Sequence, residues 1–481
     1  MAFQHSPVEL DRTLARAAGQ WTGWRLRLRT EAAKEEEGDD DVLAHFRPIA
    51  GQALFDELKD LHEQDPLREP LQRWVYRLAE QRINTDTLTR LERERRRNRQ
   101  IPDAPGKAAV SVARMLAGCL EDGPRGELWM RLFLEQAPAV SAIGVELWQR
   151  RREIARRMGL GSPAQIESSI ELSRAPAPAA LTPSAPTPAA PGAPTPPSAA
   201  PASAPLDAAV ELARRLSDSL RGRFHELAPR SPAALLGIAL GRDVGGDWPG
   251  RLSPQRLSDF FRDGDLLRSL DLRLDSMPNA LGAASFCRAL GVLGGAWFEA
   301  LAPADQPFVV AHDPYGAKRH EATALFALLP LNPQFLLRHL QVPRTALPDV
   351  QRQLAQLWLI DLGQAAFRLR LRPHALASER AFRETFSELA NRDLAVSLPP
   401  GVAGALFQLD VEDEQRLLGR LLAVERAREL TDAHDEDWFR NPRAIEQLRA
   451  EAHRPPAVRV EIGRVEAAVD ETTRRLDKLL R

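Results

Sequence analysis

Apolar residues recur at helical spacing along most of the chain, most densely between residues 281 and 329. In that stretch Phe286, Leu290 and Trp297 lie four and seven residues apart, which places them on one face of a helix. A loop rich in Pro, Asp and Gly follows, and a second apolar helix begins around Arg319. We predict that these two helices lie at the centre of a large helical domain.

The same periodicity predicts helices over most of the remaining sequence. They span residues 1–30, 42–63, 66–83, 108–121, 124–160, 206–227, 231–240, 253–274, 333–340, 346–392, 411–431 and 460–480. Ala, Leu, Arg and Glu dominate the composition, whereas Thr, Tyr and Ile are scarce. This balance favours helix over sheet. The sequence therefore predicts an all-α fold.

One segment breaks the helical pattern over a long distance. Residues 174–205 contain eleven prolines and carry no charge after Arg174, so they cannot bury a core and favour extended polyproline geometry. We predict a disordered Pro/Ala-rich linker here, the tether. It separates an N-terminal helical region, residues 1–173, from a C-terminal helical domain, residues 206–481.

Charge gives little indication of a nucleic-acid or membrane partner. Lys and Arg total 65 and Asp and Glu total 66, so the chain has no long-range attraction for polyanions. The exception is RLERERRRNR, residues 90–99, which we interpret as an exposed helix with i,i+4 ion pairs. Nucleic-acid binding is the alternative, but the run has no aromatic residue to stack on bases. We expect neither nucleic acid nor membrane as a partner.

Cysteine usage and the absence of sorting signals indicate a compartment. Cys119 and Cys287 lie in apolar surroundings and are interpreted as small buried residues, not as a disulfide or a metal pair. The first residues lack the pattern of a signal peptide, and no apolar run reaches the roughly 20 residues that span a bilayer. The expectation is a soluble cytoplasmic protein.

Three passages resemble one family of enzymes. They are ELWMRLFLEQAPAVSAIGVELWQRRREIARRMGLGS (127–162), HEATALFALLPLNPQFLLRHLQV (320–342) and RLLGRLLAVERARELTDAHDEDWFRNPRAIEQLRA (416–450). In order and spacing they resemble segments of the helical zinc metallopeptidases of the thimet oligopeptidase and oligoendopeptidase F type. The resemblance implies a large helical bundle in two lobes around a groove. It also implies a zinc site between the two central helices.

The chemistry of that family requires a motif that this chain lacks. Two imidazoles one helical turn apart and a downstream carboxylate hold the zinc, and a Glu beside the first His activates water. Of the ten histidines, only His62, His225 and His320 precede a Glu, and none has a second His three residues after that Glu. The HExxH motif is therefore absent from the sequence.

By resemblance, Arg288 stands at the first ligand position, Ala289 at the base, Val292 at the second ligand position and Glu321 at the third ligand position. A guanidinium has no lone pair to donate, so this set predicts no metal and no cofactor. A buried ion pair between Arg288 and Glu321 is one expected use of the two charges.

The resemblance also implies oxyanion donors, a Tyr and a His on a late loop and helix. The two tyrosines, Tyr76 and Tyr315, both lie outside that late region, which reads GALFQLDVEDEQRLLGRLL over residues 404–422. We therefore predict a peptidase-like protein that is not an enzyme. It would bind a peptide or a protein partner, such as an active paralogue, in its groove.

Two alternatives remain open. His312, Asp313, His320 and Glu321 fall within ten residues and could form a rebuilt metal site in an active metal-dependent hydrolase. Ordinary loop and helix-start roles explain these residues more simply, because Asp313-Pro314 is a common turn signal. The second alternative is a helical adaptor that recruits partners through its tether or its Arg-rich helix.

Overall fold

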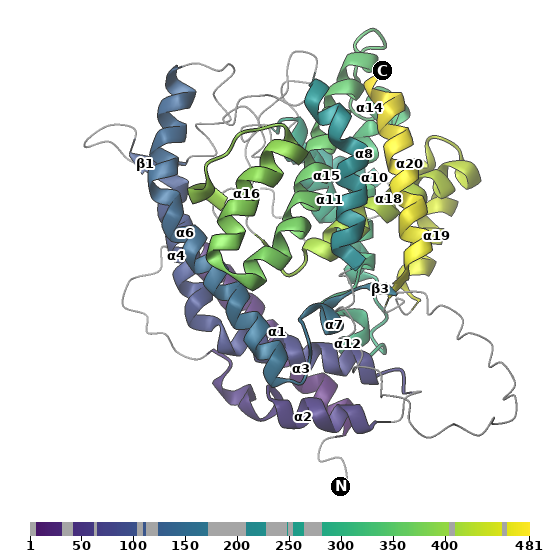
Figure 1. Cartoon of the computed structure of the whole chain (residues 1–481). Coiled ribbons are helices and arrows are strands. Elements are labelled where there is room, and N and C mark those ends of the chain that lie inside the picture. Colours follow the sequence, from purple (N-terminus) through teal and green to yellow (C-terminus); the bar gives the residue numbers. More distant parts are fainter. Residues whose placement is uncertain are drawn as a thin grey trace, which may run out of the picture.

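The computed structural model describes residues 6–30, 42–61, 65–102, 109–111, 124–171, 208–227, 248, 254–263, 281–403, 409–454 and 459–481. Most of these residues are helical (Figure 1), as the composition predicts. The tether, the helix expected at 231–240 and the end of the helix expected at 253–274 lie outside the described residues. Among the described helices, none is both long and apolar enough to cross a bilayer.

The N-terminal helices occupy the lower part and the left side of Figure 1. They are α1 (Pro7–Thr30), η1 (Ala44–Ile49), α2 (Gln52–Glu57), η2 (Leu58–Asp60), α3 (Arg68–Ile83), α4 (Thr85–Arg99), α6 (Pro124–Arg157) and α7 (Ala164–Glu167). The single helix predicted over 42–63 is wrong, since three short helices replace it. Pro48 lies inside η1, and Gly51 is extended, with φ −148° and ψ 166°. A proline lacks the N–H that a continuous helix needs.

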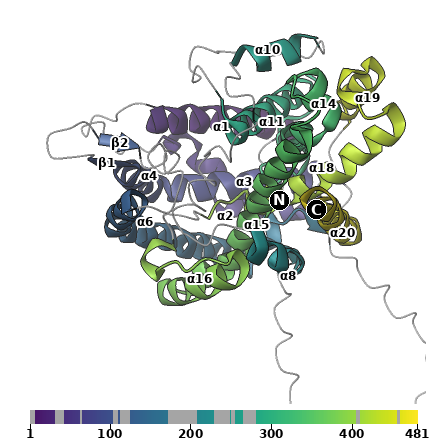
Figure 2. The same ribbon diagram turned by 90° about the horizontal axis from the view of Figure 1, so that it is seen from above.

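The C-terminal helices are assembled around α15 (Figure 2). They are α8 (Ala208–Leu227), α10 (Pro254–Asp263), α11 (Ala283–Ala300), α12 (Phe308–Ala311), α13 (Lys318–Ala327), η5 (Leu329–Leu331), α14 (Pro333–Arg338), α15 (Leu347–Ala377), α16 (Glu379–Leu394), η6 (Pro400–Val402), α18 (Asp413–His434), η7 (Trp438–Arg440), α19 (Pro442–Ala452) and α20 (Ile462–Leu480). The helix predicted over 346–392 is in fact two. It divides at Ser378, which is extended and whose hydroxyl accepts the Ala381 N–H at 3.0 Å, as an N-cap does.

Short strands depart from the all-α prediction. β1 (Gln100–Pro102) pairs antiparallel with β2 (Ala109–Ser111), and β3 (Ile170–Glu171) pairs in parallel with β4 (Val460–Glu461). The prediction of helix over 108–121 is thus wrong at 109–111, and the other positions of that segment lie outside the described residues. Ile101 faces Val110 in the first pair, and β-branched partners of this kind favour strands.

The Arg-rich helix is less exposed than predicted. α4 packs on α6, where Leu91 shares a small core with residues of that helix. Glu92 is buried and pairs with Arg95 at 2.9 Å, and Arg90 reaches Glu146 of α6 at 3.3 Å. The side chains of residues 96–99 lie outside the described part of the chain. Where it is described, this helix is therefore bound to a neighbour by apolar and ionic contacts.

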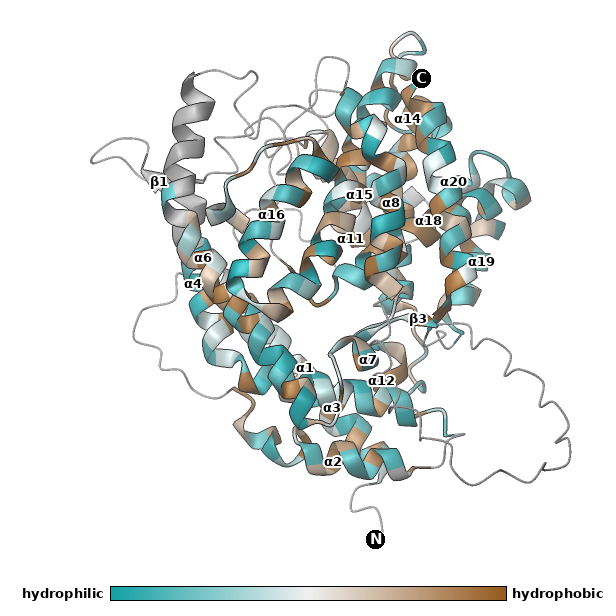
Figure 3. Ribbon diagram, in the orientation of Figure 1, coloured by the Kyte–Doolittle hydropathy of each residue, from teal (hydrophilic) through white to brown (hydrophobic). Residues whose placement is uncertain are grey.

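Buried apolar residues form two main clusters. The N-terminal cluster unites α1, α2, α3 and the end of α6 with Val309 and Tyr315 from the C-terminal part. The larger cluster joins the C-terminal helices and also takes Val145 and Trp148 of α6. Figure 3 shows apolar faces turned inward along α11, α15 and α18. Helix α6 therefore contributes to both cores.

A buried polar network joins the two cores. The Arg73 guanidinium of α3 donates to Asp313 at 2.5 Å and to the Ser168 carbonyl at 2.5 Å. The Glu414 carboxylate of α18 accepts from the Ser168 hydroxyl and the Ser169 N–H, each at 2.8 Å. Segments far apart in sequence are thereby held by charges that solvent does not reach.

Glycines allow the central helices to approach closely. A Cβ at Gly294 of α11 would lie 2.2 Å from the Phe326 ring of α13, and one at Gly295 would lie 2.2 Å from the Thr323 hydroxyl. A Cβ at Gly419 of α18 would lie 2.4 Å from the His320 carbonyl carbon. The predicted central pair, α11 and α13, therefore packs backbone against backbone with α18 on its other side.

Candidate binding pocket

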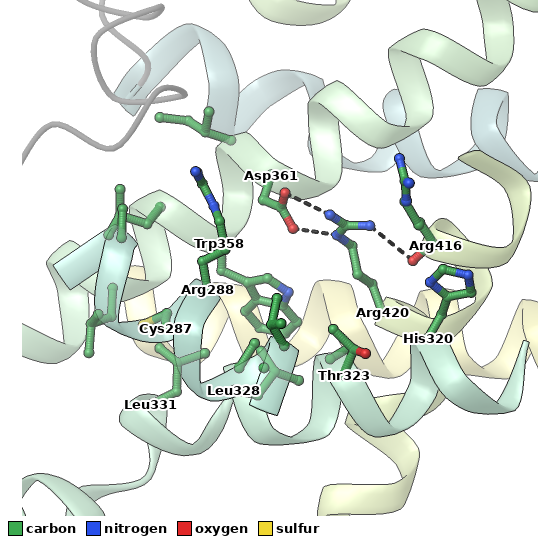
Figure 4. A pocket seen from close by; sticks show the side chains of 18 of the residues that line it. Cys287, Arg288, His320, Thr323, Leu328, Leu331, Trp358, Asp361, Arg416 and Arg420 are labelled. Carbon is green, nitrogen blue, oxygen red and sulfur yellow. Dashed lines mark hydrogen bonds and ion pairs between the residues drawn. The ribbon is translucent and has the colours of Figure 1, made fainter. Parts of the chain in front are cut away.

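A cavity of about 310 Å³ lies between α11, α13, α15 and α18 (Figure 4). All of its lining residues come from the C-terminal part of the chain, so it is not a groove between the N- and C-terminal parts. Its apolar lining is drawn mostly from α15 and the end of α13 through η5: Leu328, Leu331, Leu354, Leu357, Trp358 and Ile360. One apolar residue at the pocket, Val292 of α11, is 59% exposed. The pocket thus presents an apolar surface to solvent.

Charged side chains stand on the other walls. Arg288 of α11 and Arg416 and Arg420 of α18 line the cavity with one carboxylate, Asp361 of α15. Two hydrogen bonds join Arg420 to Asp361, one of them at 2.9 Å. Burial would raise the pKa of Asp361, but the guanidinium groups of Arg420, Arg368 and Arg288 together outweigh that effect and lower the pKa. Asp361 is therefore ionised, and three guanidinium groups face one carboxylate.

His320 is a neutral group in this charged setting. Burial lowers its pKa to about 4; Glu412 opposes the shift, and nearby arginines, Arg416 foremost, reinforce it. The Nε2 atom lies 3.9 Å from the Glu412 carboxylate, too far for a hydrogen bond. At neutral pH the imidazole carries no charge, so it offers one donor and one acceptor.

The Cys287 thiol also lines the pocket. Burial raises its pKa to about 12, which a backbone hydrogen bond and Arg288 oppose only in part. Because the thiolate is the nucleophile and the metal ligand, a thiol that stays protonated at neutral pH is inert in both roles. Cys119 lies outside the described residues.

Two of the four positions matched to the metal site line this pocket. Arg288 and Val292 lie one helical turn apart on α11 and share its wall. Ala289 instead packs against the larger core. Glu321 lines a second, smaller cavity beside Lys318 and Arg426. Arg288 and Glu321 therefore face different cavities, and the expected ion pair between these two described residues does not form.

Helix phase explains where Glu321 points. Successive residues of an α-helix point about 100° apart, and at this position α13 turns Glu321 toward the second cavity while His320 lines the first. Burial raises the pKa of Glu321, and Arg464 and Arg426 oppose that rise. Its surroundings are those of a buried carboxyl beside cations, not of a metal ligand beside imidazoles.

The rebuilt metal site is not assembled either. The four residues of that site, His312, Asp313, His320 and Glu321, each have different neighbours. His312 packs on the Phe308 ring, with centroids 4.9 Å apart. Asp313 pairs with Arg73, as described above. Across the described part of the chain, no three His, Cys, Asp or Glu side chains come close enough together to hold a metal ion. The donor set therefore does not fit the zinc that the resemblance implies.

No model of a known protein family matches the chain, and no curated protein matches it. The resemblance to zinc oligopeptidases stays a prediction.

Sequence reasoning missed most of the polar pocket residues. Asp361 and Arg420 are 59 positions apart and belong to no local motif. Trp358 and Gln364 also line the pocket, and neither belongs to a catalytic or binding motif. An i, i+3, i+6 row on α15 (Trp358, Asp361, Gln364) is the only sequence signal that could have indicated a shared face.

Proposed function

We propose that the protein is a non-catalytic binding protein, similar in fold to the two-lobed zinc oligopeptidases, that holds part of a peptide or protein partner in the pocket between α11, α13, α15 and α18. The observation that carries the proposal is the character of the α11 wall. By the resemblance, Arg288 and Val292 would stand where that family presents two imidazoles, and neither side chain can ligate zinc. The same wall opens onto an apolar cavity.

The apolar lining supplies the affinity. Burying a side chain such as Leu or Phe contributes about 1.5–3 kcal/mol, and Val292 is exposed until something covers it. A volume of about 310 Å³ is at the small end of ligand pockets, which begin at roughly 300 Å³. The pocket is therefore suited to one end of a peptide, not to an extended segment.

The first experiment measures binding to the full chain. N-acetyl-Gly-Gly-Phe and N-acetyl-Gly-Gly-Leu are titrated by calorimetry, with N-acetyl-Gly-Gly-Ser as the polar comparison. The two apolar peptides bind at least tenfold more tightly than the Ser peptide. Val292→Trp, which fills the pocket entrance, abolishes binding. Val8→Trp is the matched control, because Val8 is 56% exposed on α1 and does not line the pocket; it leaves binding unchanged.

The second experiment addresses the absence of catalysis. Metal content is measured on the purified chain, and turnover is measured with a quenched fluorescent peptide in the presence of added Zn²⁺. We expect neither stoichiometric zinc nor hydrolysis. Bound zinc together with turnover that Glu321→Ala removes would favour the hydrolase alternative. Failure of all three tripeptides to bind would contradict the peptide-binding proposal.

A further inference from the structure

In the described part of the chain, two hydrogen-bond donors at the pocket have no acceptor. They are Nε1 of Trp358 and Nε2 of Gln364, both covered from solvent. Trp358 as a residue is only 6% exposed, and both residues line the cavity. A buried donor without an acceptor costs about 1–3 kcal/mol, and native proteins retain few of them. An acceptor supplied by a ligand would remove this cost.

The charges around the cavity favour an anion over a cation. Arg288, Arg416 and Arg420 line it against the single carboxylate of Asp361, and His320 adds no charge at neutral pH. Arg416 pairs with Glu412 at 2.9 Å and with Asp410 at 3.3 Å, and two hydrogen bonds join Arg420 to Asp361. Each guanidinium has five N–H donors, so these pairs leave donors for a further oxygen atom.

We infer that the pocket recognises a carboxylate borne on an apolar body. This inference rests on the proposed function, because it names the ligand chemistry of the same site. The carboxylate accepts from the unpaired N–H groups of Trp358 and Gln364 and from the guanidinium groups, and the apolar body covers Leu331, Leu354 and Val292. Bonds between ionised partners are roughly twice as strong as neutral ones, so the charge dominates selectivity.

Two sources supply this chemistry: the C-terminal residue of a peptide, or a free apolar acid of similar size. The test therefore uses N-acetyl-phenylalanine and octanoate, each with its carboxamide, titrated into the full chain by calorimetry. Each amide keeps the apolar body and loses the charge. We expect the acids to bind at least tenfold more tightly than their amides. Raising the salt concentration weakens acid binding more than amide binding, because salt screens exposed charges.

Two variants test the donors themselves. Trp358→Phe keeps an aromatic ring and removes the N–H, and Gln364→Leu keeps the approximate shape and removes the amide. Each reduces the acid-to-amide affinity ratio at least threefold and changes amide affinity little. Trp74→Phe is the matched control, because Nε1 of Trp74 is also buried with no acceptor among the described residues but lies in the N-terminal core. It leaves the ratio unchanged.

The outcomes separate the inference from the proposed function. Equal affinity for acid and amide, with both lost in Val292→Trp, overturns the carboxylate inference and leaves peptide binding intact. An unchanged ratio in both donor variants, each folded by its thermal unfolding curve, also overturns it. Binding of neither acid nor amide contradicts both proposals. Tight binding of octanoate without N-acetyl-phenylalanine identifies the free acid, and the reverse identifies a peptide C-terminus.

Discussion

His320 shows how burial of one side chain sets the charge of the pocket. Its folded-state pKa is about 4, below the ordinary value near 6.5. The unfolded chain therefore takes up a proton between pH 6.5 and pH 4 that the folded chain does not bind. This part of the stability is fully present above pH 6.5 and is lost as the pH falls to about 4, by up to about 3 kcal/mol.

Replacing the imidazole removes this pH dependence. The free energy of unfolding in urea is measured at pH 7 and at pH 5 for the wild type and for His320→Gln. We expect the variant to lose less stability on acidification. His225→Gln is the control, because His225 is an exposed side chain of α8; its pH response should match the wild type. Equal losses in all three proteins would show that His320 is not the group responsible.

The sequence indicates only part of this site. Arg288 and Val292 share the pocket wall, as an i, i+4 pair must. The sequence does not reveal which of His320 and Glu321 faces inward, because that depends on how α13 is rotated against α18. A Cβ at Gly419 would lie 2.6 Å from the His320 Cβ, so the close crossing there sets the rotation. A contact between positions this far apart has no local signature.

At the scale of elements, the glycines of α11 decide how closely two helices cross. Gly294→Ala brings a methyl group against the Phe326 ring, and overpacking of this kind costs about 1–3 kcal/mol. Gly222→Ala is the matched control, because a Cβ at Gly222 of α8 meets nothing within 4 Å. The control should be neutral or stabilise by up to about 1 kcal/mol, since Ala favours helix over Gly.

Urea unfolding followed by far-ultraviolet circular dichroism measures both glycine variants. A Gly294→Ala protein as stable as Gly222→Ala would mean that α11 and α13 separate at little cost. Loss of stability in Gly294→Ala also predicts weaker ligand binding, because Gly291 of the same crossing lines the pocket. The close packing of α11 against α13 therefore also determines the shape of the pocket.

Element types follow from sequence more readily than element boundaries. The apolar pattern predicts α11, which presents one continuous buried face, and α13, which is buried between α11 and α18. It fails between residues 42 and 63, where Pro48 and Gly51 interrupt the helix, and at Ser378, where a cap starts a new one. In each case a single backbone requirement overrides a periodicity that continues across it.

At the scale of the molecule, the two cores are not independent. Helix α6 contributes to both, and Val309 and Tyr315 of the C-terminal part enter the N-terminal cluster. The Arg73–Asp313 pair spans 240 positions. Composition can indicate a linker at 174–205, but it cannot show that the segments on either side share buried charges. The division at that linker stays a prediction, and buried contacts join the described segments on its two sides.

The Arg73–Asp313 pair provides the test of this coupling. Arg73→Met leaves a buried carboxylate without its cation, which costs about 3–5 kcal/mol. The double variant Arg73→Met with Asp313→Leu recovers part of that loss, because no buried carboxylate is then left without its cation, while the Ser168 carbonyl still lacks the Arg73 donor. Burial already raises the pKa of Asp313 even beside Arg73, so protonation of Asp313 makes the single variant's loss of stability smaller at low pH.

Arg380→Met is the control, since its pair with Glu384 is exposed. Its loss changes the stability by less than about 1 kcal/mol. Urea unfolding is measured for all four proteins. A loss in Arg73→Met no larger than in Arg380→Met would mean that the two cores do not depend on this contact.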